Sequence, residues 1–156
     1  PAPFNAMARS HPPDLPANRL DHQLCFALYK ATNAITHTYR APLAALGLTY
    51  PQYLVLLVLW EDGQQTVGGL AQRLDLDAST LTPLLRRMEQ GGLVNRQRDP
   101  ANQRSVRITL TDRGRALEQP SAAIQQRVAC ATRLEGPAFE QLRQQLHRLS
   151  VDLKAV

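Results

Sequence analysis

Cysteine, aromatic side chains and long apolar runs are all scarce in this chain of 156 residues. The two cysteines, Cys25 and Cys130, are too few for the disulfide framework of a small secreted fold. They lie 105 positions apart, which matches no metal-ligand spacing, so we expect no metal site. The longest apolar run, from Tyr53 to Trp60, is far shorter than the roughly 18 residues that cross a bilayer. It predicts a buried helix instead.

The first seventeen residues hold five prolines and lack the charged-then-apolar order of a secretory signal. We therefore expect a flexible segment over 1–17, no export and a cytoplasmic location. Residues 18–156 have the length of one domain, enough to bury a core without disulfides or metal. No cofactor is expected.

The chain does have an excess of arginine, and this excess is local. Residues 86–115 contain eight arginines and no lysine against three acidic residues, which accounts for the whole net charge of +5. The rest of the chain balances ten basic against ten acidic residues. A solvated arginine-rich surface is one interpretation, but this density favours a polyanionic partner and phosphate contacts.

The first helix is expected over about 19–39, where apolar residues recur every three or four positions and predict one buried face. The members of this stripe are Leu20, Leu24, Leu28, Ala31 and Ile35. Cys25 lies about a quarter turn from the centre of the stripe. The helix is expected to end near Arg40 or Ala41, because Pro42 disfavours helical geometry in the residue before it.

The middle of the chain predicts a winged helix-turn-helix. Thr49 is the expected N-cap of a helix in which Gln52 closes a capping box. A short helix opens at Thr66, and a tight turn leads to a further helix over 78–90 that two glycines end. The turn "DPANQ" then joins two strands, the second with alternating apolar residues. We therefore expect a mainly α fold with a small β-hairpin wing, its DNA-binding lobe spanning 45–115.

The helix over 78–90 is the expected DNA-reading element, because an α-helix fits the major groove. Its buried side is predicted to comprise Leu81, Leu84, Leu85 and Met88. Its outward candidates for DNA contact are Ser79, Thr80, Thr82, Pro83, Arg86 and Arg87. The candidates in the hairpin, where arginine suits a minor groove, are Arg96, Arg98, Arg104 and Arg107. Whether these arginines bind guanine edges or phosphates is open at this point.

Two further helices are expected after Thr111, over about 112–134 and 137–155, with Pro120 kinking or breaking the first. One carries the apolar stripe Ile124, Val128 and Ala131, and the other carries Leu142, Leu146, Leu149 and Leu153. Packing onto the chain's own core is one interpretation. Because the winged helix already accounts for its core, we expect 18–44 and 116–156 to be dimerisation helices.

Four stretches resemble the MarR family of winged-helix regulators, and within it the organic hydroperoxide resistance regulators called OhrR. They are "LCFALY" at 24–29, "LTYPQYLVLLVLWE" at 48–61, "LTPLLRRMEQGGL" at 81–93 and "RSVRITLTDRG" at 104–114. The first two are the more specific to the hydroperoxide sensors. The resemblance implies a dimeric repressor, not an enzyme. Its reduced form binds a palindromic DNA operator and releases it once an organic hydroperoxide oxidises the protein.

The resemblance also implies roles for individual residues. The sensing thiol of the group matches Cys25, and two phenols that donate hydrogen bonds to this sulfur match Tyr39 and Tyr50. Cys130 matches the second cysteine of the two-cysteine members, which resolves the oxidised thiol by a disulfide across the dimer.

One departure from the group concerns the wing. Asn102 stands where relatives commonly carry an acidic residue that orients the arginine matching Arg104. Arg104 is therefore expected to be held more loosely, unless Asp99 takes over the role.

The chemistry of a peroxide-sensing thiol can be argued from the residues as well. The reactive form is the thiolate, so Cys25 needs hydrogen-bond donors from its surroundings. Tyr39 lies fourteen residues along the same helix, roughly 21 Å away if the helix is straight. It can help Cys25 only from a partner subunit or after the helix bends. The apolar pocket candidates Phe26 and Tyr29 would favour alkyl or lipid hydroperoxides.

Three other interpretations remain open. The first is a MarR-type repressor released by a bound small molecule, with both cysteines structural. The second, a thiol peroxidase, is disfavoured by the arginine-rich wing and by the lack of further active-site residues. The third is a chromatin-type binder, whose DNA affinity would not depend on sequence.

Overall fold

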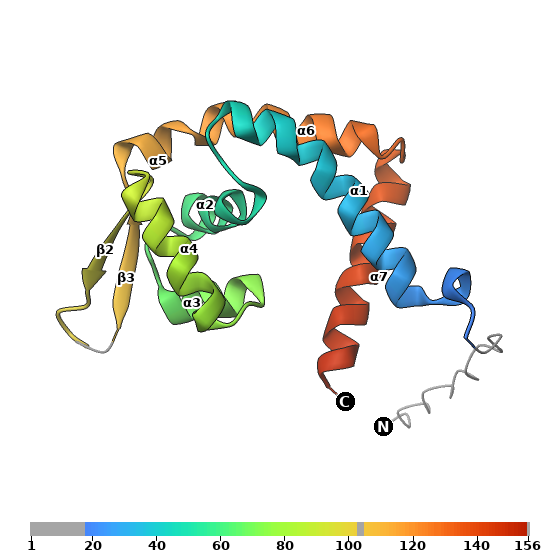
Figure 1. Ribbon diagram of the computed structural model, residues 1–156, viewed down its shortest axis with the longest axis horizontal. Coiled ribbons are helices and arrows are strands. Elements are labelled where there is room, and N and C mark those ends of the chain that lie inside the picture. The colour runs from blue at the N-terminus through green and yellow to red at the C-terminus, as the bar shows by residue number, and fades with distance from the viewer. Residues whose placement is uncertain (1–17, 103–104, 156) are drawn as a thin grey trace, which may run out of the picture. The chain divides into compact units, whose positions relative to one another are not determined.

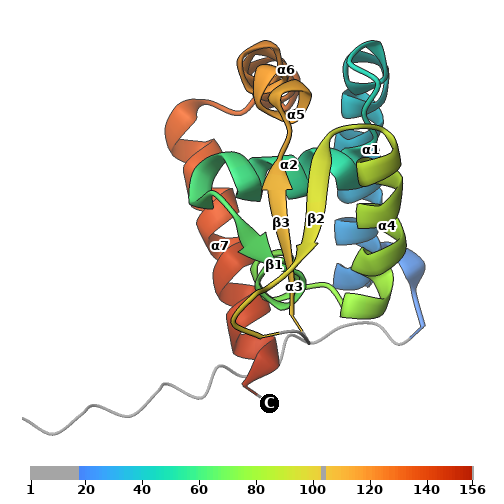
Figure 2. The same cartoon turned by 90° about the vertical axis from the view of Figure 1, so that its left-hand side faces the viewer.

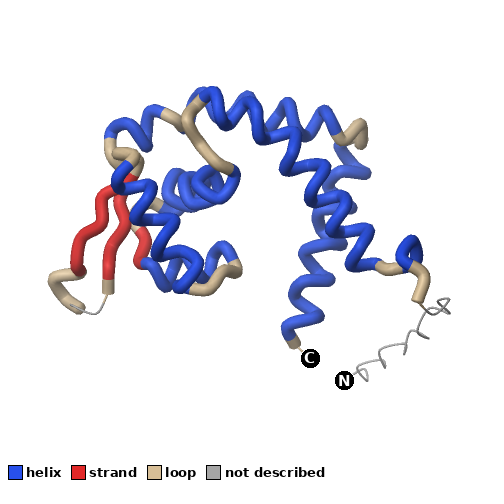
Figure 3. The backbone as a smooth tube through the Cα atoms, viewed as in Figure 1, coloured by secondary structure: helices blue, strands red, loops and turns tan. Residues whose placement is uncertain are grey.

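The computed structural model describes residues 18–102 and 105–155, and it is mainly helical with one small sheet (Figures 1 and 3). The predicted fold class is confirmed. The chain divides into two compact units, residues 1–34 and residues 35–156. The described part of the first unit contains the short 3-10 helix Leu20–His22 and the beginning of α1 (Leu24–Ala45), which continues into the second unit.

The end of α1 differs from the prediction, because the helix passes through Pro42 and continues to Ala45. Pro42 has no N–H and so removes one helical hydrogen bond. The last turn persists because Leu43 is buried in the core, where it is 1% exposed. The amides of Leu46 and Leu48 both donate to the Leu43 carbonyl, at 2.9 Å each. Burial of Leu43 therefore outweighs the local preference that Pro42 imposes on its neighbour.

Most of the stripe that was predicted to be buried is exposed in the single chain. Leu20, which lies in the 3-10 helix before α1, and Leu24 are each 60% exposed, Ile35 is 42% exposed, and Leu28 is half-buried. The periodicity therefore predicted a helix correctly but did not predict a face that the chain itself covers.

The predicted helix-turn-helix consists of α3 (Val67–Leu74) and α4 (Ala78–Gln90), and α2 (Tyr50–Asp62) precedes it. The Thr49 amide donates to Gln52 Oε1 at 2.9 Å, so the predicted start of α2 is confirmed. Thr66 caps α3, since its hydroxyl oxygen accepts from the Gly69 amide at 3.0 Å.

The wing is part of a three-stranded antiparallel sheet in the order β1-β3-β2, as Figure 2 shows. The predicted hairpin is confirmed as β2 (Val94–Arg98) and β3 (Val106–Leu110). The sequence did not predict β1 (Gln65–Thr66), which pairs with the other edge of β3. These two polar residues carry no strand pattern of their own, and their pairing depends on the position of β3.

The third helical segment begins at α5 (Asp112–Ala116) and continues as α6 (Glu118–Ala131) and α7 (Gly136–Lys154). The break expected at Pro120 falls at Leu117 instead, three residues earlier. Pro120 then lies in the first turn of α6, where a missing N–H leaves no helical bond unmade.

Within residues 35–156, one core joins α2, α3, α4, β2, β3 and α6. Its members from α6 are Ile124 and Val128, which are 6% and 5% exposed. The expectation that this stripe faces a second subunit was therefore wrong for these two residues. The α6 stripe completes the winged-helix core, because α2 packs against α6.

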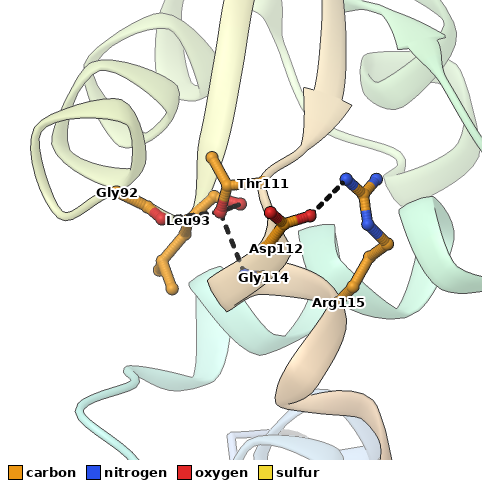
Figure 4. A network of polar contacts seen from close by, with 6 residues as sticks. All are labelled: Gly92, Leu93, Thr111, Asp112, Gly114 and Arg115. Atoms are coloured by element: carbon orange, nitrogen blue, oxygen red, sulfur yellow. Dashed lines mark hydrogen bonds and ion pairs between the residues drawn. The ribbon is translucent and has the colours of Figure 1, made fainter.

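The junction between α4 and α5 is bound together by hydrogen bonds (Figure 4). The Thr111 hydroxyl donates to the Gly92 carbonyl at 2.7 Å, and the Thr111 amide donates to the Leu93 carbonyl at 3.1 Å. Arg113 Nη1 donates to the Gly91 carbonyl at 2.6 Å. The Thr111 hydroxyl oxygen also accepts from the Gly114 amide at 3.0 Å, which confirms Thr111 as the cap of α5.

Among the described residues, no single helix has the length and apolar composition to cross a membrane. The helices α1 and α2 pass that test only as a pair, bent by 78° at their break.

Candidate nucleic-acid interface and thiol site

The helix α4 has one buried and one exposed side. Its buried side chains are those that the sequence predicted, Leu81, Leu84, Leu85 and Met88. The side chains of Ser79, Thr80, Pro83, Arg86 and Arg87 are exposed, and Thr82 is half-buried. The Thr82 hydroxyl donates to the Ala78 carbonyl at 2.8 Å, so it is already bonded within the helix. The exposed side therefore offers two hydroxyls and two guanidinium groups to a partner.

The arginines of the wing are in different environments. Arg98, at the end of β2, is exposed. The side chain of Arg96 is only 20% exposed and pairs with Glu89 of α4 at 3.5 Å, which ties the wing to the end of that helix. Its Nε is buried without a hydrogen-bond partner. Arg104 lies outside the described residues.

Asp99 organises the start of the wing turn. Its Oδ1 accepts from the Ala101 amide at 2.9 Å and from Arg107 Nη2 at 3.0 Å. The Ala101 amide, followed by the Arg107 guanidinium, lowers the pKa of this carboxyl. Arg107 is thus oriented by Asp99, the residue that the sequence offered as a substitute partner for Arg104.

Three tyrosines from α1 and α2 form an aromatic cluster in the second unit. The ring centroids of Tyr39 and Tyr50 are 5.0 Å apart, and Tyr53 lies 5.8 Å from Tyr39. Burial, and after it the neighbouring phenols, raise the pKa of Tyr39 to about 12. Burial also raises the pKa of Tyr50. The upward shifts therefore leave unchanged what any tyrosine does at neutral pH, where the phenol keeps its proton and can act as a hydrogen-bond donor.

The sequence did not predict that Tyr53 belongs to this aromatic cluster, because it was treated only as part of an apolar run. Its ring is 2% exposed and contacts both Tyr50 and Trp60. The spacing of three between Tyr50 and Tyr53 puts both rings on one side of α2, and this was the signal available in the sequence.

Cys130 lines a cavity of about 690 Å³ bounded by the second half of α1, by α6 and by the start of α7. The walls include Tyr39, Val128 and Phe139. The thiol is exposed, and Gln126 Nε2 is a weak donor to its sulfur at 3.8 Å. The structure therefore brings Cys130 and one of the two predicted phenols to the same cavity.

Cys25 lies in the first turn of α1, and its thiol is free and exposed. Of the two pocket candidates beside it, Phe26 is half-buried and Tyr29 is 63% exposed. Lys30 lies over the Phe26 ring, with Nζ 5.5 Å from its centroid. Cys25 belongs to the first unit and the tyrosines to the second.

Metal chemistry has no candidate in the part of the chain that the structure describes. No three or more His, Cys, Asp or Glu side chains gather there in an arrangement that could hold an ion.

The chain is similar to regulators of one family along most of its length. The model of the MarR family matches residues 48–106. The organic hydroperoxide resistance transcriptional regulator of Bacillus subtilis (strain 168) is 41% identical over 131 residues, covering 84% of this chain and 89% of that protein.

Solved structures of AbfR, a protein of Staphylococcus epidermidis, are also similar. Reduced AbfR bound to DNA has a TM-score of 0.70 at 37% identity, covering 86% of this chain and 94% of that one. Disulfide-formed AbfR has a TM-score of 0.58 at 37% identity, covering 88% and 91%. With this winged-helix fold and these relatives, the chain belongs to the MarR family of transcriptional regulators.

Proposed function

We propose that this regulator is a peroxide-sensing repressor. Its reduced homodimer binds a palindromic operator, and oxidation of Cys25 by an organic hydroperoxide releases the DNA. The two-cysteine cycle is completed by a disulfide between Cys25 of one subunit and Cys130 of the other. The relatives support this function, since one is an organic hydroperoxide resistance regulator and another was solved in a disulfide form.

The observation that carries the proposal is the pairing of Tyr39 with Tyr50. The resemblance to the hydroperoxide regulators implies one shared task for these two residues, hydrogen bonding to the sensing thiolate, although they lie on different helices. Their rings are 5.0 Å apart, and both phenols, like any tyrosine at neutral pH, carry the proton that a hydrogen-bond donor needs. A pair of protonated phenols can stabilise a thiolate, because hydrogen bonding to the charged form favours it.

The position of Cys130 supports the second half of the cycle. Its thiol is exposed and shares a cavity with Tyr39, so a sulfur that reaches the phenols also approaches Cys130. A disulfide requires Cα atoms within roughly 7 Å of each other, and in the proposed cycle it is the partner subunit that brings its Cys25 this close to Cys130.

The proposed chemistry has two balanced steps. The Cys25 thiolate attacks the outer peroxide oxygen, the O–O bond breaks, and the products are a sulfenic acid and an alkoxide that takes up a proton. The Cys130 thiol then displaces the sulfenic hydroxyl, which leaves as water, and the S–S bond forms. The peroxide is reduced to an alcohol and water, and the two thiols supply both electrons.

For DNA contact, we propose that α4 enters the major groove. Its candidate contact residues are the half-buried Thr82 and the exposed Ser79, Thr80, Pro83, Arg86 and Arg87. Arg98, Arg104 and Arg107 of the wing are placed beside the adjacent minor groove, as in other winged helices. Arg96 contributes mainly by bracing the wing, because its guanidinium faces Glu89.

For dimerisation, we propose that residues 18–44 and α7 form the subunit interface, while 45–115 form the DNA-binding lobe. On α7 the side chains of Leu142, Leu146 and Leu153 are exposed at 45%, 40% and 67%. Exposed leucines at helical spacing are of the kind that a stable interface covers, and Leu20 and Leu24 of the first unit are likewise 60% exposed.

The test compares operator binding by the reduced protein before and after treatment with cumene hydroperoxide, with and without dithiothreitol. The DNA is the fragment that reduced protein enriches most from a random pool. We expect oxidation to release it and a reductant to restore binding. Non-reducing gels should show a linked dimer that is absent from Cys25→Ser and from Cys130→Ser. Thiol-independent release, or monomer on every gel, would instead favour a repressor released by a bound small molecule.

A further inference from the structure

A second cavity, of about 340 Å³, lies between the last turns of α1 and the first turn of α2. Its volume falls in the range of roughly 300–1,000 Å³ that is common for small-molecule sites. The aliphatic part of its wall is formed by Leu43, Ala44, Leu48 and Pro51. Among the lining residues, Arg40 is the one that carries a charge, and none is acidic.

Arg40 is available to bind an anion. Its side chain is exposed, so it lies where the cavity meets solvent. In the described part of the chain, no carboxylate pairs with Arg40, as is also true of exposed arginines such as Arg86 and Arg98, and what distinguishes Arg40 is its place at a cavity with an aliphatic wall. A guanidinium fork matches the two oxygens of a carboxylate, and such bidentate pairs are among the strong hydrogen bonds of proteins. An apolar cavity with one arginine at its mouth suits an organic acid.

The two cavities meet the same pair of phenols. Tyr50 lines the smaller cavity, while Tyr39 lines the larger one that contains Cys130. Their rings are 5.0 Å apart, so the phenols lie between the Arg40 cavity and the Cys130 cavity. Consecutive residues on a helix differ in direction by about 100°, which explains how Tyr39 and Arg40 face different cavities.

We propose that Arg40 binds the carboxylate of the inducer, so that the preferred inducers are hydroperoxides of organic acids. The carboxylate lies at Arg40, the hydrocarbon chain follows the wall of the smaller cavity, and the hydroperoxide group reaches the Tyr39–Tyr50 pair. The carboxylate takes no part in the redox step, in which only the O–O bond breaks. This inference rests on the proposed function, because it names the class of peroxide that the same site takes.

The experiment compares the rate of Cys25 oxidation by the hydroperoxide of an eighteen-carbon fatty acid with that by its methyl ester. The full-length reduced protein is used at neutral pH, where the acid is ionised and the ester is neutral. We expect the acid to react roughly tenfold faster than the ester, as one charge-assisted bidentate contact predicts. In Arg40→Gln the acid-to-ester ratio should fall to about one, and Arg40→Lys should retain part of it.

Two controls distinguish the loss of carboxylate binding at Arg40 from a general effect of removing an arginine. Arg127→Gln removes an exposed arginine of α6 that lines neither cavity, and it should keep the wild-type ratio. Decanoate, which has the carboxylate but no peroxide, should slow oxidation by the acid hydroperoxide in wild type and not in Arg40→Gln. Operator binding by the reduced protein should be the same in all variants.

Failure of this inference is distinguishable from failure of the proposed function. If cumene hydroperoxide, which is neutral, leaves Cys25 reduced, the sensor function itself is wrong. If cumene hydroperoxide oxidises Cys25 normally but wild type treats acid and ester alike, the carboxylate site alone is overturned. An acid-to-ester ratio that survives unchanged in Arg40→Gln also overturns it.

Discussion

The indole Nε1 of Trp60 donates a hydrogen bond to the carbonyl oxygen of Gly114 at 3.0 Å, and this bond joins α2 to the first turn of α5. Residue 114 has to be a glycine because the backbone of Leu93 also lies close to it. A Cβ at residue 114 would overlap the carbonyl oxygen of Leu93, which lies at the start of the wing. Gly114 therefore lets three parts of the winged helix meet at one point.

Gly114→Ala is expected to lower the free energy of unfolding by about 1–3 kcal/mol, since backbone has to shift to relieve the overlap. Urea denaturation at fixed protein concentration measures this, because dimer stability depends on concentration. Gly136→Ala, at the start of α7, is the matched control: its Cβ meets nothing within 4 Å, and its effect should range from neutral to a stabilisation of about 1 kcal/mol. Equal effects of the two substitutions would contradict the packing described for Gly114.

The raised pKa of Tyr39 predicts a loss of stability in alkali. An unfolded tyrosine ionises near pH 10, while in the folded protein the pKa of Tyr39 is about 12. Its contribution is therefore fully present below pH 10 and is lost as the pH rises towards about 12. Urea midpoints measured between pH 9 and pH 11 should fall less steeply in Tyr39→Phe than in wild type. Between pH 7 and pH 9, where Tyr39 stays protonated in both the folded and the unfolded state, the midpoints of the two proteins should change in parallel.

The two arginines of β2 are expected to act differently in DNA binding. Arg98 is exposed, so Arg98→Gln should weaken binding and reduce the slope of log affinity against log salt by about 1. Arg96 pairs with Glu89 and is mostly buried, so Arg96→Gln should mainly lower the free energy of unfolding. Titrations at several salt concentrations, together with urea denaturation, distinguish these effects. Equal changes of salt slope in both variants would mean that Arg96 contacts phosphate directly.

The exposed leucines of α7 are expected to hold the dimer together. The double substitution Leu142→Asn with Leu146→Asn should raise the dimer dissociation constant at least tenfold, because each buried leucine contributes about 1.5–3 kcal/mol. Sedimentation velocity over a range of concentrations gives this constant. The control, Gln141→Asn with Gln145→Asn, changes two polar positions of the same helix. An unchanged dimer in the leucine variant would place the interface elsewhere.

The parts of the fold that the sequence predicted correctly are those that depend only on residues close together in the sequence. The capping box of Thr49 and Gln52 needs only four consecutive positions, and the alternation around Ile108 needs only one strand. The errors arose where distant packing decides. Leu43 keeps α1 helical beyond Pro42, and Val128 faces the chain's own core, because α2 and the sheet supply partners that no local pattern reveals.

In the candidate site, too, local patterns predicted some residues, while others are brought together only by packing between helices. The exposed residues of α4 followed from helical periodicity once Leu81 and Leu85 were assigned to the core. The meeting of Tyr39 with Tyr50 depends on how α1 packs against α2, so the residues suggested it only through resemblance to a family. Arg40 and its cavity had no sequence signal, since a single arginine after a tyrosine is common on any helix surface.

The hydrogen bonds at the end of α4 have a mechanical consequence. Three consecutive carbonyls, those of Gly91, Gly92 and Leu93, are bound by Thr111 and Arg113 from the other side of the wing. These bonds fasten the end of the DNA-reading helix to the start of α5 on the far side of the wing, so we expect a displacement of α5 to carry the end of α4 with it. Beyond the break at Leu117 the chain continues as α6, the helix that carries Cys130.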